Sequence, residues 1–144
     1  MAGTVEFSVV TPSEVKFAGQ AEIVVAPGAA GDLGALPNHA PMLTTLRIGV
    51  VRATVIDTSA DAKSPTKRLE FAVDGGFMQI LPERVVVLSD VALAATDIDA
   101  DAARTELRRA EETLAAKRGV DDLAERRAAA WASARLEVAH RLDV

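Results

Sequence analysis

The composition of the chain changes abruptly near residue 94, and this change constrains the fold more than any other feature of the sequence. All six prolines, all four phenylalanines and eight of the nine glycines lie before it. The last fifty of the 144 residues instead contain fourteen alanines and eight arginines. Strands favour β-branched and aromatic residues between Gly and Pro turns, whereas helices favour Ala, Leu, Glu and Arg. The sequence therefore predicts a β domain over residues 1–94 and a helical domain over residues 95–144.

The first domain is predicted to be a series of short strands ended by turn residues. Pro27-Gly28 stops one of them, and the polar stretch 58–67 predicts the tip of a hairpin. Asp74-Gly75-Gly76 predicts a tight turn. Turns at intervals of roughly 8–12 residues are typical of an antiparallel β sandwich or flattened barrel. The predicted strands cover residues 4–11, 20–26, 48–57, 68–74, 77–81 and 84–89.

The second domain has the residue spacing of two helices joined by a short turn. Acidic residues precede the first helix and Lys117 ends it, as the helix dipole favours, and Gly119 suits a left-handed cap. Asp122, with Glu125 three residues later, predicts the start of the second helix. Because the turn is short, we expect an antiparallel hairpin. The predicted apolar faces contain Ile98, Ala102, Leu107, Ala110 and Leu114 in the first helix and Leu123, Ala130, Trp131, Ala134 and Val138 in the second.

Composition also excludes several functional classes. The absence of cysteine rules out disulfides, thiol nucleophiles and cysteine-ligated metals, and two histidines argue against a His-built metal centre. A net charge of −5 and 3% aromatic residues argue against nucleic-acid binding. The sequence shows neither a secretory signal nor the run of roughly 20 apolar residues that spans a bilayer. We therefore expect a soluble protein of a reducing compartment, without cofactor or metal.

No set of residues predicts a catalytic site. His39, within Pro37-Asn38-His39-Ala40-Pro41, is open to two interpretations: a general base or binding residue, or a loop histidine hydrogen-bonded to nearby backbone. The serines lack the Gly-x-Ser-x-Gly context of a nucleophile elbow. Asp97, Asp99 and Asp101 are better explained as helix-capping residues than as calcium ligands, because the glycine and glutamate of a calcium loop are missing. We therefore expect a protein that is not an enzyme.

Three collinear motifs resemble the epsilon subunits of F-type ATP synthases. The first joins Gly31-Asp32-Leu33-Gly34 to residues 37–44, PNHAPMLT, and is similar to the family pattern G-E/D-L/M-G followed by P-x-H-A-P-L-L-T. The second runs from Gly75-Gly76-Phe77 to Val91, and the third leads from Asp97-Ile98-Asp99 into the Ala-rich helical segment. Together they cover nearly the whole chain in the family's order. The chain is thus identified as resembling the epsilon subunit, the equivalent of the mitochondrial delta subunit.

The resemblance implies a sandwich of about ten short antiparallel strands followed by an antiparallel α-helical hairpin. In the family, the sandwich performs no chemistry, lies at the foot of the gamma shaft and rests on the membrane rotor ring. By motif position, Asp32 is expected to face the ring subunits, and His39 and Thr44 to lie near gamma. Membrane association is expected only through the complex, on the cytoplasmic face of the bacterial plasma membrane.

The resemblance also implies a regulatory role for the hairpin. In bacterial relatives, the hairpin folded against the sandwich permits turnover, and the hairpin extended along the shaft blocks ATP hydrolysis. A helix of about twenty residues is roughly 30 Å long, which suffices to lie beside the shaft. The arginine pairs of the helices are open to two interpretations, a solvated helix surface or inhibitory contacts with an acidic segment of the catalytic subunits. The residues concerned are Arg108, Arg109, Arg126 and Arg127.

One motif departs from the family. Some relatives bind ATP through an I/L-D-x-x-R-A motif at the first helix, whereas here Ile98-Asp99 is followed by Ala102-Ala103 and the arginine is displaced to Arg104. Because a two-residue shift turns a side chain by about 200° around a helix, we expect no tight ATP binding. Two alternatives to the rotor subunit are a free-standing nucleotide-sensing β-sandwich module and a small hydrolase that uses His39.

Overall fold

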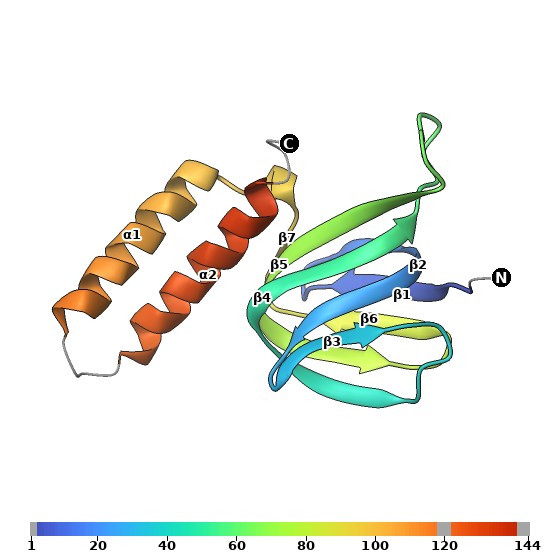
Figure 1. Ribbon diagram of the computed structural model, residues 1–144, viewed down its shortest axis with the longest axis horizontal. Coiled ribbons are helices and arrows are strands. Elements are labelled where there is room, and N and C mark those ends of the chain that lie inside the picture. The colour runs from blue at the N-terminus through green and yellow to red at the C-terminus, as the bar shows by residue number, and fades with distance from the viewer. Residues whose placement is uncertain (1–2, 118–121, 141–144) are drawn as a thin grey trace.

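A computed structural model describes residues 3–117 and 122–140, and this part of the chain contains seven strands followed by helices (Figure 1). The strands are β1 (Val5–Val10), β2 (Val15–Gly28), β3 (Gly31–Ala35), β4 (Met42–Ile56), β5 (Thr66–Ile80), β6 (Arg84–Leu88) and β7 (Ala92–Leu93). The helices are the short 3-10 helix η1 (Ala95–Asp97), α1 (Ala100–Ala116) and α2 (Leu123–Ala139). The predicted fold class, a β sandwich followed by an antiparallel helical hairpin, is confirmed.

The strands form one sheet that curls back on itself. Their order is β1-β6-β5-β4-β2-β3, β7 also pairs with β5, and a pairing of β1 with β2 closes the sheet. Most neighbours are antiparallel, as predicted, but β1 and β6 run parallel. Closure leaves few unpaired edges, so the two layers enclose a continuous apolar interior.

Three strands are much longer than the sequence predicts. β2 has 14 residues and β4 and β5 have 15 each, so the described residues form seven strands instead of about ten. The residue-by-residue pairing of β4 with β5 runs from Met42–Ile80 to Ile56–Thr66 without a shift. A long strand pair of this kind bends from one layer into the other, and each long strand therefore replaces two short ones.

Gly75 and Gly76 make this bend possible, and the prediction of a tight turn at Asp74-Gly75-Gly76 was wrong. The two glycines lie inside β5 with φ angles of 81° and 116°, a region that other residues rarely adopt. Val73 and Met78 are both fully buried although they are five positions apart, whereas regular alternation would place them on opposite faces. The glycine pair therefore exchanges the inner and outer faces of β5 and bends the strand without ending it.

A hairpin tip is found where the sequence predicts one, although the last two residues of the predicted stretch 58–67 belong to β5. Ile56 of β4 lies opposite Thr66 of β5, and the Asp57 N–H donates to the Pro65 carbonyl at 3.0 Å. Figure 1 shows this loop projecting well beyond the body of the sheet. The sequence succeeds here because a polar stretch with Pro and Ser has nothing to bury.

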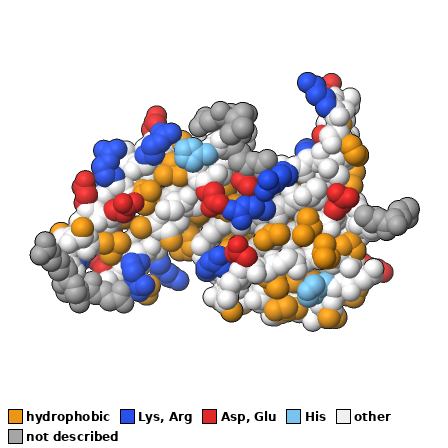
Figure 2. Space-filling model, in the orientation of Figure 1, with side chains coloured by type: hydrophobic (Ala, Val, Ile, Leu, Met, Phe, Trp, Pro, Cys, Tyr) orange, Lys and Arg blue, Asp and Glu red, His pale blue; other side chains and the backbone are white. Residues whose placement is uncertain are grey.

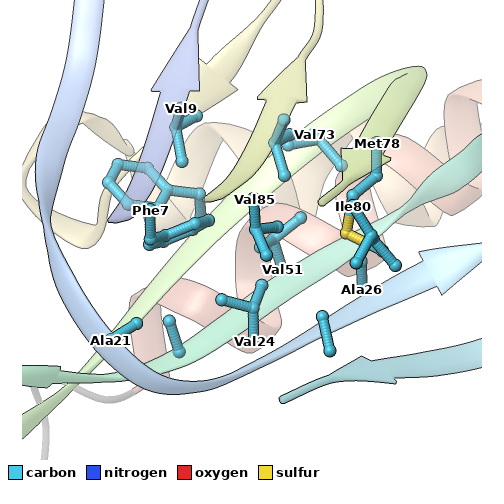
Figure 3. Packing of buried hydrophobic residues seen from close by; sticks show 14 of the residues in the cluster. Phe7, Val9, Ala21, Val24, Ala26, Val51, Val73, Met78, Ile80 and Val85 are labelled. Atoms are coloured by element: carbon cyan, nitrogen blue, oxygen red, sulfur yellow. The ribbon is translucent and has the colours of Figure 1, made fainter. Parts of the chain in front are cut away.

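The sandwich core consists of aliphatic side chains with little aromatic content. Phe7, Val24 and Ile80 are among its largest fully buried members, and Figure 3 shows such side chains from both layers pointing toward one another. Phe7 also meets Phe17, with ring centroids 5.7 Å apart. Burial of this apolar surface contributes about 25 cal/mol per Å² and is the main term that stabilises the sandwich.

Both helices begin at the predicted aspartates. The Asp99 side chain accepts from the Ala102 N–H at 3.1 Å, and the Asp122 side chain accepts from the Glu125 N–H at 3.0 Å. Each bond satisfies one of the unpaired N–H groups at a helix start. The predicted cap at Gly119 lies outside the described residues.

The helices are stacked on one side of the sandwich, with α2 between the sheet and α1 (Figure 1). In α2, Ala134 and Val138 are buried as predicted, but Leu123 and Ala130 are exposed and were wrongly assigned to the apolar face. Leu123 is the first residue of α2, and its side chain is 58% exposed. No helix within the described ranges is long and apolar enough to cross a membrane.

Candidate functional site

Asp32 lies at the start of β3 and pairs with a cation of its own chain. Its carboxylate accepts from Arg47 Nη2 at 2.5 Å, and Arg47 Nη1 donates to the Gly28 carbonyl at 2.6 Å. The pair is about half exposed, with side-chain exposures of 55% for Asp32 and 47% for Arg47. Arg47 thus ties the β2–β3 turn to β4, and it leaves one side of the Asp32 carboxylate open to solvent.

His39 lies in the loop between β3 and β4, which is held in place by backbone contacts. Asn38 adopts a left-handed φ of 65°, and its N–H donates to the Pro82 carbonyl at 2.9 Å. The His39 Nδ1 lies 2.7 Å from the Ala40 carbonyl oxygen, so this nitrogen carries the proton and donates. The hydrogen bond to nearby backbone that one of the two interpretations predicts is therefore present, and the role of His39 as a binding residue stays a prediction.

Thr44 lies in β4 opposite Met78 of β5, and its hydroxyl donates to the Thr45 carbonyl at 3.3 Å. Asp32 and His39 belong to opposite ends of the β3 segment, and a five-residue strand spans about 17 Å. In the described part of the chain, no hydrogen bond or ion pair joins any two of the three predicted partner-binding residues. They are distributed along the β3–β4 side of the sandwich, an arrangement suited to an extended contact surface.

A row of apolar side chains, most of them exposed, crosses the outer face of the sandwich, and it was not predicted. Cross-strand pairing places Phe77 of β5 beside Leu88 of β6, Leu88 beside Val10 of β1, and Val10 beside Val15 of β2. Phe77, Leu88 and Val15 are 49%, 44% and 60% exposed. We call these four residues the apolar row. Its only sequence signal was the glycine pair, whose bend turns Phe77 outward.

The four predicted arginine contacts, Arg108, Arg109, Arg126 and Arg127, are all exposed on the two helices. Figure 2 shows basic and acidic side chains interspersed over the hairpin, whereas the sandwich carries larger apolar patches. Arg104, the displaced arginine of the ATP motif, pairs with Asp101 at 2.5 Å. Asp99, the acidic residue of that motif, is occupied as the cap of α1.

The contact between α2 and the sheet is small and partly ionic. Ala134 and Val138 pack on Val50 of β4 and Ala72 of β5, with Trp131 at the margin. Beside them, Arg52 of β4 pairs with Glu70 of β5 at 3.3 Å and also with Glu137 of α2. Arg52 therefore keeps one partner within the sheet whether or not α2 is in place.

The two helices are joined to each other by separate charge contacts. Arg135 of α2 pairs with Glu106 of α1, and its guanidinium lies 5.4 Å from the centre of the Trp131 ring. At the turn, Lys117 pairs with Asp122. The hydrogen bond with Lys117 and the Glu125 N–H lower the pKa of Asp122, and the hydrogen bond with Asp122 raises the pKa of Lys117.

The chain is similar to known proteins over most of its length. Residues 4–95 match the family model of the ATP synthase delta/epsilon chain β-sandwich domain. The ATP synthase epsilon chain of Desulforamulus reducens is 41% identical over 117 residues, which cover 81% of this chain and 82% of the relative. The epsilon chain of Herminiimonas arsenicoxydans is 38% identical over 144 residues, 99% of this chain and 97% of the relative.

Solved structures show the same fold at much lower identity. A chain of the Euglena gracilis mitochondrial ATP synthase superposes with a TM-score of 0.64 at 17% identity, over 98% of this chain and 80% of that chain. A chain of the Tetrahymena thermophila mitochondrial ATP synthase central stalk and c-ring gives 0.54 at 15% identity, over 97% and 96%. With the family match over the sandwich and the epsilon-chain relatives over the helices as well, the chain belongs to the family of ATP synthase epsilon chains, the non-catalytic central-stalk subunits of F-type ATP synthases.

Proposed function

We propose that this chain couples the gamma shaft of an F-type ATP synthase to the membrane rotor ring, and that its helical hairpin restrains ATP hydrolysis. The observation that carries the proposal is the match to ATP synthase epsilon chains, which spans both the sandwich and the helices. The complex would hold the chain at the cytoplasmic face of the bacterial plasma membrane. No chemistry is assigned to the chain itself.

In this proposal, the sandwich supplies two contact surfaces. Asp32 faces polar loops of the ring subunits, and its half-exposed carboxylate has room for a second cation beside Arg47. His39 and Thr44 belong to the surface for gamma, together with the apolar row. Exposed apolar side chains in a contiguous strip are typical of a protein interface.

The hairpin is proposed to leave the sandwich and to contact the catalytic subunits through Arg108, Arg109, Arg126 and Arg127. Two features support this. The buried part of the α2–sheet contact consists of only four small side chains, Val50, Ala72, Ala134 and Val138, and the four arginines are exposed while the hairpin is docked.

Co-purification tests the assignment to the complex. A tagged version of the full chain, expressed in cells that make the matching ATP synthase, is expected to retain gamma, ring and catalytic subunits from detergent-solubilised membranes. A chain that emerges alone under conditions in which the native complex stays intact would contradict the proposal.

The inhibitory role is tested by reversing the charge of all four arginines to glutamate in the assembled complex. ATP hydrolysis is expected to rise, because the acidic segment of the catalytic subunit would then be repelled. Reversal of Arg68 and Arg84, two exposed arginines of the sandwich, is the control. Equal activity in native and four-arginine complexes would remove the inhibitory assignment and leave the coupling role intact.

Calorimetry separates the rotor subunit from a nucleotide sensor. We expect the isolated chain to show no micromolar affinity for ATP, since Arg104 and Asp99 are engaged with neighbours in their own helix. Micromolar binding that requires no partner would favour the sensor.

A further inference from the structure

A cleft lies between α2 and the part of the sandwich that carries Asp32. Its volume is about 350 Å³. The sandwich lines it with Asp32 of β3, with Pro27 of β2 and with residues of β4, and the hairpin lines it with Ala130, Ser133, Ala134 and Glu137 of α2. The carboxylate that is proposed to face the ring and the helix that is proposed to leave the sandwich therefore border the same space.

Four charged side chains line this cleft, and they form two neighbouring ion pairs. Arg47 of β4 pairs with Asp32 at 2.5 Å, and Arg52 of β4 pairs with Glu137 of α2. Figure 2 shows basic and acidic side chains gathered where the hairpin meets the sandwich. Each carboxylate thus borders the same cleft as both arginines, although each is paired with only one of them.

The side chains of Arg47 and Glu137 are free to form a different pair. A guanidinium has five N–H donors, and Arg47 uses Nη2 for Asp32 and Nη1 for the Gly28 carbonyl. A carboxylate accepts several hydrogen bonds, and that from Arg52 falls on Oε1 of Glu137. Side-chain exposures of 47% for Arg47 and 53% for Glu137 show that packing holds neither of them in one rotamer.

We propose that Arg47 is shared between Asp32 and Glu137, so that neutralisation of Asp32 strengthens the docking of α2. While Asp32 holds Arg47, the ion pair between β4 and α2 is that of Arg52 with Glu137. When another cation takes Asp32, Arg47 turns to Glu137 and adds a second ion pair between the sandwich and the helix. The inference rests on the proposed function, because that cation is taken to come from the ring. Engagement of the ring would then favour the docked hairpin.

A single introduced thiol measures the docked fraction of the hairpin in the full chain. The sequence has no cysteine, and Ala134 of α2 is 4% exposed where it packs on Val50 and Ala72. In Ala134→Cys, iodoacetamide reaches the thiol when α2 leaves the sheet, so the alkylation rate follows the undocked fraction. Every further variant carries this substitution and is compared with its own background.

With this thiol in place, Asp32→Asn is expected to slow alkylation about threefold, the size of effect that one half-exposed ion pair produces. The slowing should disappear in an Arg47→Gln or a Glu137→Gln background and persist with Arg47→Lys, which keeps the positive charge. Salt of about 1 M should remove it. The matched control, Asp61→Asn, removes the same charge from the exposed β4–β5 loop and should leave the rate unchanged.

Three results would overturn the proposal. The first is an unchanged or faster alkylation rate in Asp32→Asn. The second is equal slowing in the Arg47→Gln background, which would assign the effect to direct repulsion between Asp32 and Glu137. The third is equal slowing in the Asp61→Asn control, which would assign it to net charge. The proposed function fails separately: if the thiol rates change as expected but the chain retains no ring subunits in co-purification, Arg47 is shared as proposed and only the assignment of the cation to the ring is lost.

Discussion

The sandwich core and the α2–sheet contact lie on the two faces of the same strands, β4 and β5, yet they are built differently. The inner face packs Val51, Val55 and Phe71 into a large cluster of Val, Ile, Phe and Met side chains. On the outer face, Val50 and Ala72 pack against Ala134 and Val138 of α2. From this difference we expect the hairpin to be attached to the sandwich by a smaller free energy than the one that stabilises the sandwich core.

The largest loss of stability is expected from a substitution that leaves a cavity in the sandwich core. Phe7→Ala removes a ring that is 1% exposed, and we expect a loss of about 3–5 kcal/mol in the free energy of unfolding. This is a large part of the 5–15 kcal/mol that is typical of a domain. Urea denaturation followed by circular dichroism measures it. A loss below about 1 kcal/mol would contradict the assignment of the main stabilising term to this core.

A somewhat smaller loss of stability is expected at the glycine bend of β5. This bend separates the half of the strand that α2 covers from the half that it leaves uncovered. Gly76→Ala places a Cβ against the Leu88 carbonyl and should cost about 1–3 kcal/mol of unfolding free energy through backbone strain. Gly34→Ala is the matched control, because an added Cβ there has no atom within 4 Å. Equal melting temperatures for the two variants would show that the bend tolerates a side chain.

The next largest effect is expected on the docking of α2 against the sheet. Val138→Ala removes two buried carbons and should weaken docking of the hairpin by about 1–2 kcal/mol. Trp131, the single tryptophan of the chain, lies at the margin of this contact and reports docking through its emission. We expect a red shift of that emission with an unchanged urea midpoint for the sandwich. A red shift accompanied by a lower urea midpoint would show that the hairpin and the sandwich unfold as one unit.

A weaker effect is expected from the ionic part of the contact. Glu137→Gln should cost about 0.5 kcal/mol of docking, since side-chain exposures of 31% for Arg52 and 53% for Glu137 leave the pair screened by water. Raising the salt toward about 1 M, where the Debye length is roughly 3 Å, should erase the difference from the native chain. Trp131 emission at low and high salt checks this. A difference that persists at high salt would show that the Gln acts through packing.

The smallest effect concerns the helical turn in acid. The pKa of Asp122 is lowered in the folded protein, so its contribution is present above about pH 4, the usual range of an aspartate, and is lost as the pH falls through the lower folded-state value. Ellipticity at 222 nm should therefore fall in this window for the native chain. Asp122→Asn, which keeps a capping side chain without the charge, should remove the pH dependence. An identical titration in the two proteins would assign the acid response to other carboxylates.

How far the sequence predicts this molecule can be judged from a few residues. Asp99, Asp122 and the loop at 58–67 were predictable because capping and turn formation depend on neighbours in the chain. Gly75-Gly76 was not, because a glycine pair permits a turn and a bent strand equally well, and the choice depends on which strands lie alongside. Leu123 was misassigned because helical periodicity identifies apolar residues but does not say how far the covering surface extends.

In the candidate site, too, individual residues were identified from the sequence, but their arrangement was not. The motif residues Asp32, His39 and Thr44 were found from sequence, but their pairing and spacing along β3 and β4 were not. The apolar row escaped notice because its members come from four strands, β1, β2, β5 and β6, and become neighbours only through cross-strand register. Likewise, nothing in the sequence links Arg52 to Glu137, which are eighty-five positions apart.

By itself, then, the sequence determined the change from strands to helices near residue 94, the starts of both helices and the family, since each depends on local composition and order. The tertiary structure alone decided which half of β5 is covered by α2 and which half leaves Phe77 exposed. The physical reason is that the conformational preferences of a residue depend on neighbours only a few positions away in the chain. The faces of a sheet are set by the pairing of strands and by the single bend that two glycines allow.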